Sequence, residues 1–305
     1  MSKFKRKNKL KADAILMADP HIRPDTPVCR TDDFFLAMSK KLDFILNLSK
    51  ENDCPILLAG DLGHKSQWPN WLLEWFISKA KGYNIIAIVG QHDLPNHKIS
   101  LFEKSGMGVL NAAGVIQTIF EEKWYDDILI HPFPYGKEIE HVKLINKPMH
   151  QIAMTHQMII ENKVLWPDQT APKGHQILKQ YPEFSLILSG DNHNAFTVEQ
   201  DGRWLVNPGS LMRTTTDQID HKPRVYLWFA ETNEIKPVYL PIEQNVISRT
   251  HIDIAKNREI RNQAFISRVN EDVEIDLSYE ENLKKYFARY RTEKPVENKV
   301  WDSVK

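Results

Sequence analysis

The sequence predicts an α/β fold, and three features of the chain support this class. Five short apolar runs, typical of buried strands, are each followed at once by side chains that bind metals. Segments with helical spacing lie between the early runs, and hairpin patterns occupy a later part of the chain. Strands that pack side by side bring their ends to one edge of a sheet, where ligands bind in open α/β folds. We therefore expect the functional site at that edge.

Composition restricts the class of protein but indicates no ligand. The chain has 305 residues, 42% hydrophobic and 26% charged, which suits a soluble protein with one large domain and a smaller one. Lys and Arg together number 40, as do Asp and Glu, so the net charge favours neither nucleic acid nor membrane. Cys29 and Cys54 form no CxxC pair, and no apolar run is long enough for a signal peptide or a membrane helix. We expect a cytoplasmic protein without a membrane, and a disordered basic tail at 1–11, with a DNA-binding arm as the alternative.

The first hundred residues alternate strand and helix. Apolar residues recur at helical spacing between positions 35 and 46, and Thr31 or Asp32 can cap the start of that helix. The aromatic-rich segment after the second strand ends at Gly82, a typical helix stop. We expect strands at 12–18, 55–61 and 84–89, and helices at 31–50 and 70–81.

The middle of the chain predicts a second sheet. Short β-prone runs at 115–120 and 127–133 predict hairpins of that sheet, and turn signals at 201–202 and 232–233 predict two later hairpins. In this part we expect a helix at 138–145, a strand at 151–155, a helix at 172–180, a strand at 184–189, and hairpins over 195–206 and 224–240.

The composition changes after Pro241. The following residues are highly charged and hold no cluster of metal ligands, so we divide the chain into a main domain, 1–242, and a C-terminal segment, 243–305. Residues 278–281 form a capping box, which predicts a helix, and a shorter apolar stripe follows Pro295. The segment is either a small cap folded onto the main domain or a surface that docks a partner protein, and the sequence allows both.

The polar residues after the five apolar runs are those of a two-metal hydrolytic site. Two divalent ions about 3.5–4 Å apart make hydroxide from bound water and clamp phosphate oxygens. Carboxylate, imidazole and amide ligands suit manganese, iron or zinc, and a histidine off the metal supplies the leaving group with a proton. Asp61 is the best candidate for a carboxylate shared by both ions. The candidates at the five ends are Asp19, His21, Asp61, His64, Gln91, His92, Asp93, His156, Asp191 and His193. Arg23 and His97 are candidate phosphate contacts, with ordinary surface loop residues as the alternative.

The order of these motifs resembles the calcineurin-like metallophosphoesterase superfamily over about residues 12–240. The pattern is Asp-x-His at 19–21, Gly-Asp-x-x-His at 60–64, Gly-x-His-Asp at 90–93, a single histidine at 156, Gly-x-x-His at 190–193 and Asn-Pro-Gly-Ser at 207–210. His64, three residues after Asp61, resembles the SbcD-type DNA double-strand-break repair exonucleases in a compact, phage-like version. Serine/threonine phosphatases of the superfamily carry an aspartate and an arginine there instead. The resemblance implies a four-layer sandwich, with two mixed β-sheets flanked by helices.

Carried over residue by residue, the resemblance implies a role for each candidate. One ion would be held by Asp19, His21, Asp61 and His193, and the other by Asp61, Gln91, His156 and Asp191. His92 would donate the proton to the leaving group, His64 would position the phosphate or scissile end, and Asp93 would orient His92. The implied partners are DNA, an SbcC-type coiled-coil ATPase bound by the C-terminal segment, and a second copy of the chain in a homodimer.

Two positions depart from the family pattern, and both belong to the second ion. Gln91 stands where asparagine is usual, and Asp191 stands where histidine is usual. Because Asp191 replaces a neutral ligand with an anion, we predict that this site prefers manganese or magnesium over zinc. Manganese is the expected ion, with magnesium, iron and zinc as alternatives.

Three functions fit this sequence. The first, which we favour, is a metal-dependent DNA exonuclease or endonuclease subunit of an SbcCD-like DNA repair or recombination complex. The second is a metallophosphoesterase that acts on small phosphodiesters or phosphoproteins. The third is a non-enzymatic DNA-end-binding scaffold, which the near-complete ligand set disfavours because unpaired buried carboxylates cost stability.

Overall fold

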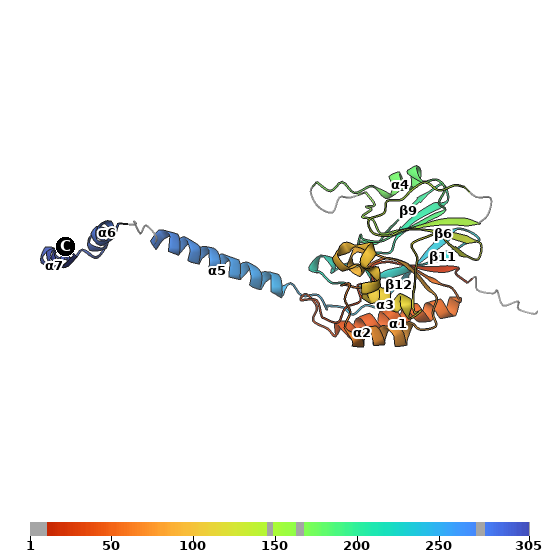
Figure 1. The fold of residues 1–305 in the computed structure, drawn as a ribbon, viewed down its shortest axis with the longest axis horizontal. Helices are drawn as coiled ribbons and strands as arrows, with labels where there is room; N and C mark the ends of the chain where they lie inside the picture. The colour runs from red at the N-terminus through yellow and green to blue at the C-terminus, as the bar shows by residue number, and fades with distance from the viewer. Residues whose placement is uncertain (1–10, 145–148, 163–167, 273–277, 305) are drawn as a thin grey trace, which may run out of the picture. The chain divides into compact units, whose positions relative to one another are not determined.

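The computed structural model describes residues 11–144, 149–162, 168–272 and 278–304 (Figure 1). The chain forms two compact units, Met1–Ser248 and Arg249–Lys305, which are described separately below. The composition change at 242–243 therefore lies a few residues before the division between the units. The predicted basic tail lies outside the described residues, except for Lys11.

The first sheet has six strands in the order β12-β11-β1-β2-β3-β4. β1 runs parallel to β2, β2 to β3, and β3 to β4, while β11 pairs antiparallel with both β1 and β12. The carboxyl ends of β1, β2 and β3 therefore lie at one edge. The strands are β1 (Ala14–Met17), β2 (Ile56–Ala59), β3 (Ile85–Ile88), β4 (Gln117–Thr118), β11 (Arg224–Phe229) and β12 (Glu234–Tyr239).

The second sheet also has six strands, in the order β5-β6-β7-β8-β10-β9. β6, β7, β8 and β10 are parallel, and β5 and β9 are antiparallel edge strands. The strands are β5 (Lys123–Tyr125), β6 (Ile128–Phe133), β7 (His150–Thr155), β8 (Leu186–Ser189), β9 (Phe196–Gln200) and β10 (Arg203–Asn207). Both sheets are mixed, as predicted.

Helices cover the outer face of each sheet, which completes the predicted four layers. Helices α1 (Phe34–Asn52) and α2 (Asn70–Ala80) lie against the first sheet, with α3 (Gly106–Ala112) nearby, and α4 (Gly174–Gln180) lies against the second (Figure 1). Short 3₁₀ turns at Gln91–Asp93, Pro95–His97 and Ile99–Lys104 follow β3.

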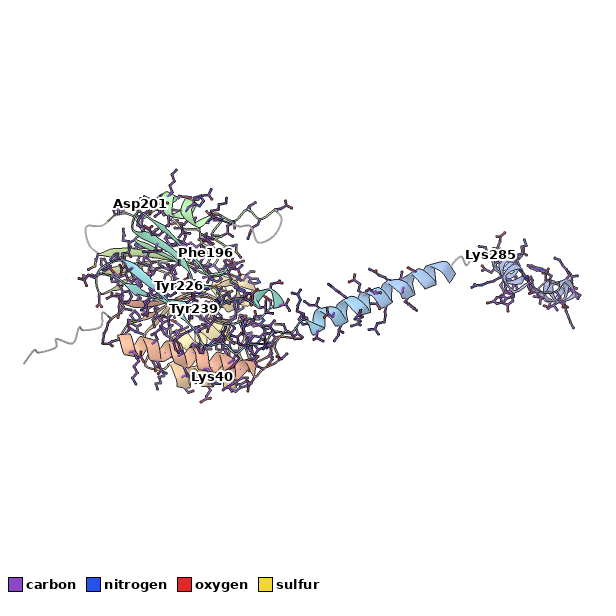
Figure 2. All side chains as sticks on the ribbon, turned by 180° about the vertical axis from the view of Figure 1, so that it is seen from behind. Lys40, Phe196, Asp201, Tyr226, Tyr239 and Lys285 are labelled. Atoms are coloured by element: carbon purple, nitrogen blue, oxygen red, sulfur yellow. The ribbon has the colours of Figure 1, made fainter. Side chains whose placement is uncertain are left out.

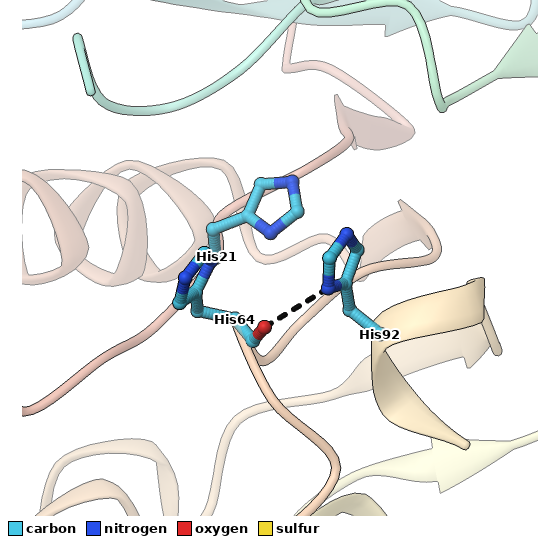
Figure 3. Close-up of side chains that lie close together, drawn as sticks. All are labelled: His21, His64 and His92. Atoms are coloured by element: carbon cyan, nitrogen blue, oxygen red, sulfur yellow. Dashed lines mark hydrogen bonds between the residues drawn. The ribbon is translucent and has the colours of Figure 1, made fainter. Parts of the chain in front are cut away.

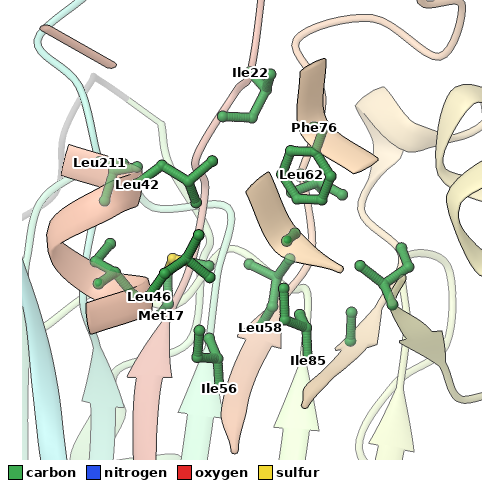
Figure 4. Close-up of a cluster of buried hydrophobic side chains, with 14 of the residues drawn as sticks. Met17, Ile22, Leu42, Leu46, Ile56, Leu58, Leu62, Phe76, Ile85 and Leu211 are labelled. Carbon is green, nitrogen blue, oxygen red and sulfur yellow. The ribbon is translucent and has the colours of Figure 1, made fainter. Parts of the chain in front are cut away.

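The side chains of a buried strand face two different cores in alternation. In β2, Ile56 and Leu58 pack against the helices, and Leu57 and Ala59 pack between the two sheets. Figure 4 shows Ile56 and Leu58 in the same cluster as Leu42 and Leu46 of α1. Because both faces are buried, the strand reads as a continuous apolar run, which is why it was recognisable in the sequence.

Two predictions for the middle of the chain are wrong. Residues 138–144 form no helix: Ile139 packs into the core beside α4, and Glu183 accepts the backbone N–H of Val142. The Glu183 carboxylate takes the place of a helical acceptor for Val142, and the burial of Ile139 holds the segment in an irregular conformation. Residues 115–120 form no hairpin of the second sheet, because their strand, β4, pairs in parallel with β3 at the edge of the first sheet.

The start of α1 also differs slightly from the prediction. Asp33, rather than Thr31 or Asp32, is the N-cap, and its carboxylate accepts the N–H of Leu36 at 2.9 Å. The helix begins at Phe34, three residues later than predicted, while its apolar face is the predicted one.

The C-terminal unit contains α5 (Thr250–Asp272), α6 (Tyr279–Tyr290) and α7 (Lys294–Val304). The helix predicted from the capping box is present, and the Ser278 hydroxyl accepts the N–H of Glu281 at 3.4 Å. Phe287 of α6 is buried with its ring centroid 5.9 Å from that of Trp301 in α7. Across the described ranges, no helix combines the length and apolarity needed to cross a membrane.

Candidate active site

The predicted ligands lie where strands of both sheets end. β1, β2 and β3 of the first sheet lead to Asp19, Asp61 and Gln91, and β7 and β8 of the second lead to His156 and Asp191. A hydrogen bond joins the two sheets here, since His156 Nδ1 lies 2.6 Å from the carbonyl oxygen of Ala59 in β2. The five ends therefore gather at one place, but three belong to the first sheet and two to the second, so the expectation of a single sheet edge is only partly correct.

The backbone pairing of the first two strands continues beyond their ends. The N–H of His21 donates to the Asp61 carbonyl at 3.1 Å, and the N–H of His64 donates to the Ile22 carbonyl at 3.0 Å. This pairing fixes the two loops side by side. Four ligand candidates there have a left-handed backbone, with φ of 49° at Asp19, 46° at His21, 51° at Asp61 and 73° at Asp191. Such strain is uncommon in residues other than glycine and concentrates at functional sites.

The glycines of the motifs are required by close approach. A Cβ at Gly90 would lie 2.1 Å from Asp61 Oδ1, and one at Gly190 would lie 2.2 Å from the Ala59 carbonyl oxygen. Either contact is far shorter than van der Waals distance, so a side chain at these positions would displace the ligands. The glycine before the candidate ligand, Gln91 in one motif and Asp191 in the other, thus has a steric cause.

One group of ligand atoms comes from Asp19, His21 and His193, which all lie within 4.8 Å of one another. The Nε2 atoms of His21 and His193 are 2.9 Å apart. Two imidazole nitrogens that converge in this way present their lone pairs to a common point. This is the set that the sequence assigns to one ion, together with Asp61.

A second group comes from Asp19, Asp61 and His156. Asp61 Oδ2 lies 3.5 Å from His156 Nε2 and 3.7 Å from His21 Nε2, so it stands between the two groups. Gln91 and Asp191, the two unusual residues, contact each other, because Gln91 Nε2 donates to Asp191 Oδ1 at 2.7 Å. The structure therefore brings all the predicted ligands together.

The residues present fit divalent cations. Buried atoms without a hydrogen-bond partner include Asp19 Oδ2, Asp61 Oδ2, Gln91 Oε1 and His156 Nε2. Burial, and then the charge of Asp61, raises the pKa of Asp19 to about 8. Burial would also raise the pKa of Asp61, but His156 and His21 outweigh it and hold that pKa at about 2. Unpartnered buried carboxylate, amide and imidazole atoms form a typical ligand set for two hard or borderline ions.

His64 and His92 lie beside His21, one of these ligands (Figure 3). The rings of His64 and His92 are stacked, with centroids 5.7 Å apart, and the ring of His21 stands edge-on to His92 at 5.0 Å. His92 Nδ1 lies 3.0 Å from the His64 carbonyl oxygen, and His92 Nε2 lies 4.0 Å from Asp61 Oδ2. Because Nδ1 donates to the carbonyl, a proton that the ring gains or loses is carried on Nε2, toward the ligands.

Asp93 orients backbone rather than the His92 ring. Its carboxylate accepts the N–H groups of Gly63 and Gly90 at 2.9 Å and that of Leu62 at 3.3 Å. It therefore ties the loop after β2 to the loop after β3, and the His64 carbonyl orients the ring instead. The expected pairing of Asp93 with His92 needs this correction.

The two candidate phosphate contacts lie at the margin of the site. Arg23 is half-buried and pairs with Asp25, and it is close enough to His64 to contribute, after burial, to lowering the pKa of His64 to about 4. His97 is exposed, and its Nδ1 lies 3.1 Å from the Gln91 carbonyl oxygen. Both are placed where a substrate could reach them.

The loop that follows β10 also supports the site, a role that was not predicted from the sequence. The N–H of Ser210 donates to the His193 carbonyl and that of Leu211 donates to the Asp19 carbonyl, both at 3.1 Å. The loop thus holds two ligand-bearing segments together. Its Asn-Pro-Gly-Ser sequence was the available signal.

The family of this chain follows from its match to a model of a known protein family. The model described as calcineurin-like phosphoesterase matches residues 14–195, which include every predicted ligand. The chain belongs to the calcineurin-like phosphoesterase family. Its fold and ligand set are therefore those of a metal-dependent phosphoesterase, as the motif order predicted.

Solved structures with similar folds include three that this phosphoesterase resembles at low identity. One is described as a novel archaeal phosphodiesterase (13% identity, TM-score 0.41, covering 74% of this chain and 99% of that one). The others are TT1561 of Thermus thermophilus (12%, 0.48, 76% and 99%) and the hypothetical protein PH1004 from Pyrococcus horikoshii (15%, 0.41, 80% and 94%). No curated protein matches the chain.

Proposed function

We propose that this phosphoesterase is a two-metal-dependent phosphodiesterase that cleaves DNA, as the nuclease subunit of an SbcCD-like repair or recombination complex. The observation that carries the proposal is the place of His64. The loop after Asp61 returns it beside His92, with the two rings stacked. This is the position at which the SbcD-type pattern has its histidine and the phosphatase pattern does not.

The chain's own residues divide the work of hydrolysis. When bound, the two ions would supply hydroxide and offset the charge of the phosphate. Asp61, between the two ligand groups, is suited to hold both ions. His92, whose side chain is 39% exposed, can carry a proton on Nε2 for the leaving oxygen. His64 lies beside His92, and Arg23 lies near His64, where the two can contact phosphate oxygens.

The oxygen atoms that Gln91 and Asp191 bring to the site support the proposed preference for manganese or magnesium. Both side chains offer oxygen to the second ion, where the family pattern has asparagine and histidine. Hard ions favour oxygen over nitrogen. A titration of hydrolysis with each metal tests this, and higher activity with zinc than with manganese would contradict it.

The proposed partners are a coiled-coil ATPase of the SbcC type and a second copy of the chain. The ATPase would dock on the C-terminal unit, where Tyr279, Tyr286 and Tyr290 of α6 are each more than half exposed. Co-purification with such an ATPase that Tyr286→Ala abolishes would support this surface, and unaffected binding would exclude it. The mass of the full chain in solution tests the homodimer.

A second function, hydrolysis of small phosphodiesters, is favoured by a cavity beside the ligands. The cavity has a volume of about 530 Å³, and its lining includes His156, Asp191, Tyr135 and Tyr181. That volume is within the range of small-molecule sites, about 300–1,000 Å³. The cavity offers room for the alcohol group of a compact ester.

The deciding experiment incubates the full chain with linear duplex DNA and manganese. A chelator and His92→Ala are the negative controls, and His175→Ala, at an exposed position on α4, is the matched histidine control. DNA degradation lost with both negative controls and retained with His175→Ala supports the nuclease. Hydrolysis of bis-p-nitrophenyl phosphate without DNA degradation would favour the second function, and hydrolysis of neither would contradict both.

A further inference from the structure

Three basic side chains are buried together behind the loop that follows β10. Arg30, Lys41 and Arg213 are only 9%, 3% and 4% exposed. One carboxylate pairs with them, since Asp32 accepts from Arg30 Nε at 2.8 Å and from Arg30 Nη2 at 2.6 Å. The cluster therefore buries more positive than negative charge, and buried charge without a counter-charge is costly.

The other hydrogen bonds that the cluster makes among the described residues go to backbone carbonyls, which are neutral. Lys41 Nζ donates to the Leu211 carbonyl and Arg30 Nη1 to the Arg213 carbonyl, both at 3.0 Å. Arg213 donates to the carbonyls of Ile219 and Glu243, but its buried Nε has no hydrogen-bond partner among the described residues. The cluster holds an unsatisfied donor as well as an excess of charge.

A pocket opens onto this cluster. It is lined by Arg30, Lys41 and Arg213, and by Lys40, an exposed residue of α1 that Figure 2 labels. Its volume is about 140 Å³. Pockets for drug-sized ligands begin at about 300 Å³, so this one suits a group the size of a phosphate.

The acidic residues at the pocket do not neutralise its interior. Asp32 is engaged by Arg30, and Asp33 caps α1 from an exposed position. Glu243 is exposed as well. Solvent screens these two carboxylates, whereas the buried charges of Arg30 and Arg213, and that of Lys41 when it is protonated, are screened little.

We propose that this basic pocket, formed by Arg30, Lys40, Lys41 and Arg213, binds a phosphate group. The ligand is inorganic phosphate or the terminal phosphate of a nucleotide, because a tetrahedral oxyanion both fits the volume and offers acceptors to buried Arg and Lys. Leu211 connects the pocket to the metal ligands through its backbone. Its carbonyl accepts a hydrogen bond from Lys41, and its N–H donates to the carbonyl of Asp19. A phosphate here would therefore stabilise the loop that holds Asp19 and His193.

Thermal unfolding of the full chain in chelator tests the proposal without phosphate bound at the metal ligands. The midpoint of thermal unfolding is measured at increasing phosphate concentrations, and each value is compared with that in sodium chloride of equal ionic strength. The variants are Lys41→Met, which keeps most of the side-chain volume, and Lys50→Met, an exposed lysine of the same helix away from this pocket. Phosphate also stabilises proteins in general through exclusion from their surface, but that effect is common to all variants.

We expect phosphate to raise the midpoint of the wild type and of Lys50→Met more than that of Lys41→Met. The apparent dissociation constant should rise about tenfold or more in Lys41→Met, as expected for the loss of one charge-assisted hydrogen bond. Should Lys41→Met fail to fold, Lys40→Ala at the exposed wall gives the same comparison. Equal phosphate dependence in the wild type, in Lys50→Met and in the pocket variants would overturn the proposal.

The source of the phosphate is tested with a deoxynucleoside 5′-monophosphate in place of inorganic phosphate. A Lys41-dependent shift with both ligands assigns the pocket to terminal phosphates as well as the free ion. A shift with inorganic phosphate alone assigns it to the free ion. A shift with neither would overturn the site.

Discussion

Replacing Gly60 with alanine should displace His156 while leaving the fold intact. A Cβ at Gly60 would lie 2.3 Å from His156 Nδ1 and 2.9 Å from the Gly90 nitrogen, so the ring must move by about an ångström to reach van der Waals distance. That movement breaks the bond from His156 Nδ1 to the Ala59 carbonyl and shifts Nε2 away from Asp61. A misplacement of about 1 Å at a reacting centre costs on the order of 10²-fold in rate.

Gly82→Ala is the matched control for this change. Both glycines have a left-handed backbone, with φ of +86° and +91°, but nothing lies within 4 Å of a Cβ at Gly82. Each variant should lose about 1–2 kcal/mol of stability from backbone strain, and Gly60→Ala about 0.5–1.5 kcal/mol more for the hydrogen bond. The assays are urea unfolding and manganese-dependent hydrolysis of bis-p-nitrophenyl phosphate. If Gly60→Ala hydrolyses this ester as well as Gly82→Ala does, the assigned role of His156 is refuted.

Three further predictions concern a proton donor, a ligand and a buried lysine. His92→Gln should lower the rate of DNA cleavage by about 10²–10⁴-fold, because the DNA leaving oxygen needs a proton. The rate of cleavage of a p-nitrophenyl ester should fall by less, because p-nitrophenolate leaves without one. Equal losses with both substrates would show that His92 is not the proton donor. Asp19→Asn removes a buried charge beside Asp61, so it should raise the midpoint of thermal unfolding of the protein in chelator at pH 8. Its activity with manganese should fall more than about 10²-fold. A lower midpoint than that of the wild type would contradict the burial of unpaired charge. Burial, with Arg30 and Arg213 nearby, lowers the pKa of Lys41 from 10.5 to about 7, so the unfolded chain binds more protons between these pH values. Above pH 7 in phosphate-free buffer, the free energy of unfolding of the wild type should therefore rise by up to about 1.4 kcal/mol per pH unit relative to that of Lys41→Met. Urea unfolding at several pH values measures this difference. Parallel pH profiles of the two proteins would contradict the lowered pKa of Lys41.

The sequence was most informative where one physical rule relates a residue's position in the chain to its location in the fold. Strands buried on both faces read as apolar runs, and parallel strands end at a common edge, so Asp19 and Asp61 could be assigned to one site, whereas His156 reaches that site from the second sheet. Gly60, Gly90 and Gly190 were visible as motif letters, although their steric cause required coordinates.

The sequence was least informative where the tertiary environment decides the local structure. Ile139 and Val142 have helical spacing, but burial beside α4 and an acceptor from Glu183 hold them in an irregular segment. The true partner of His92 is a backbone carbonyl, which has no signature in the sequence. Arg30 and Arg213 of the basic pocket are 183 positions apart, and no pattern along the chain connects them.

The central claim is that the ends of five strands hold two divalent ions that share Asp61. Calorimetric titration of the metal-free full chain with manganese tests it most directly, alongside Asp61→Asn. The predicted result is two ions bound per chain, with both affinities weakened by Asp61→Asn because its carboxylate stands between the two groups. Failure to bind manganese, or two ions bound with affinities that Asp61→Asn leaves unchanged, would contradict the claim.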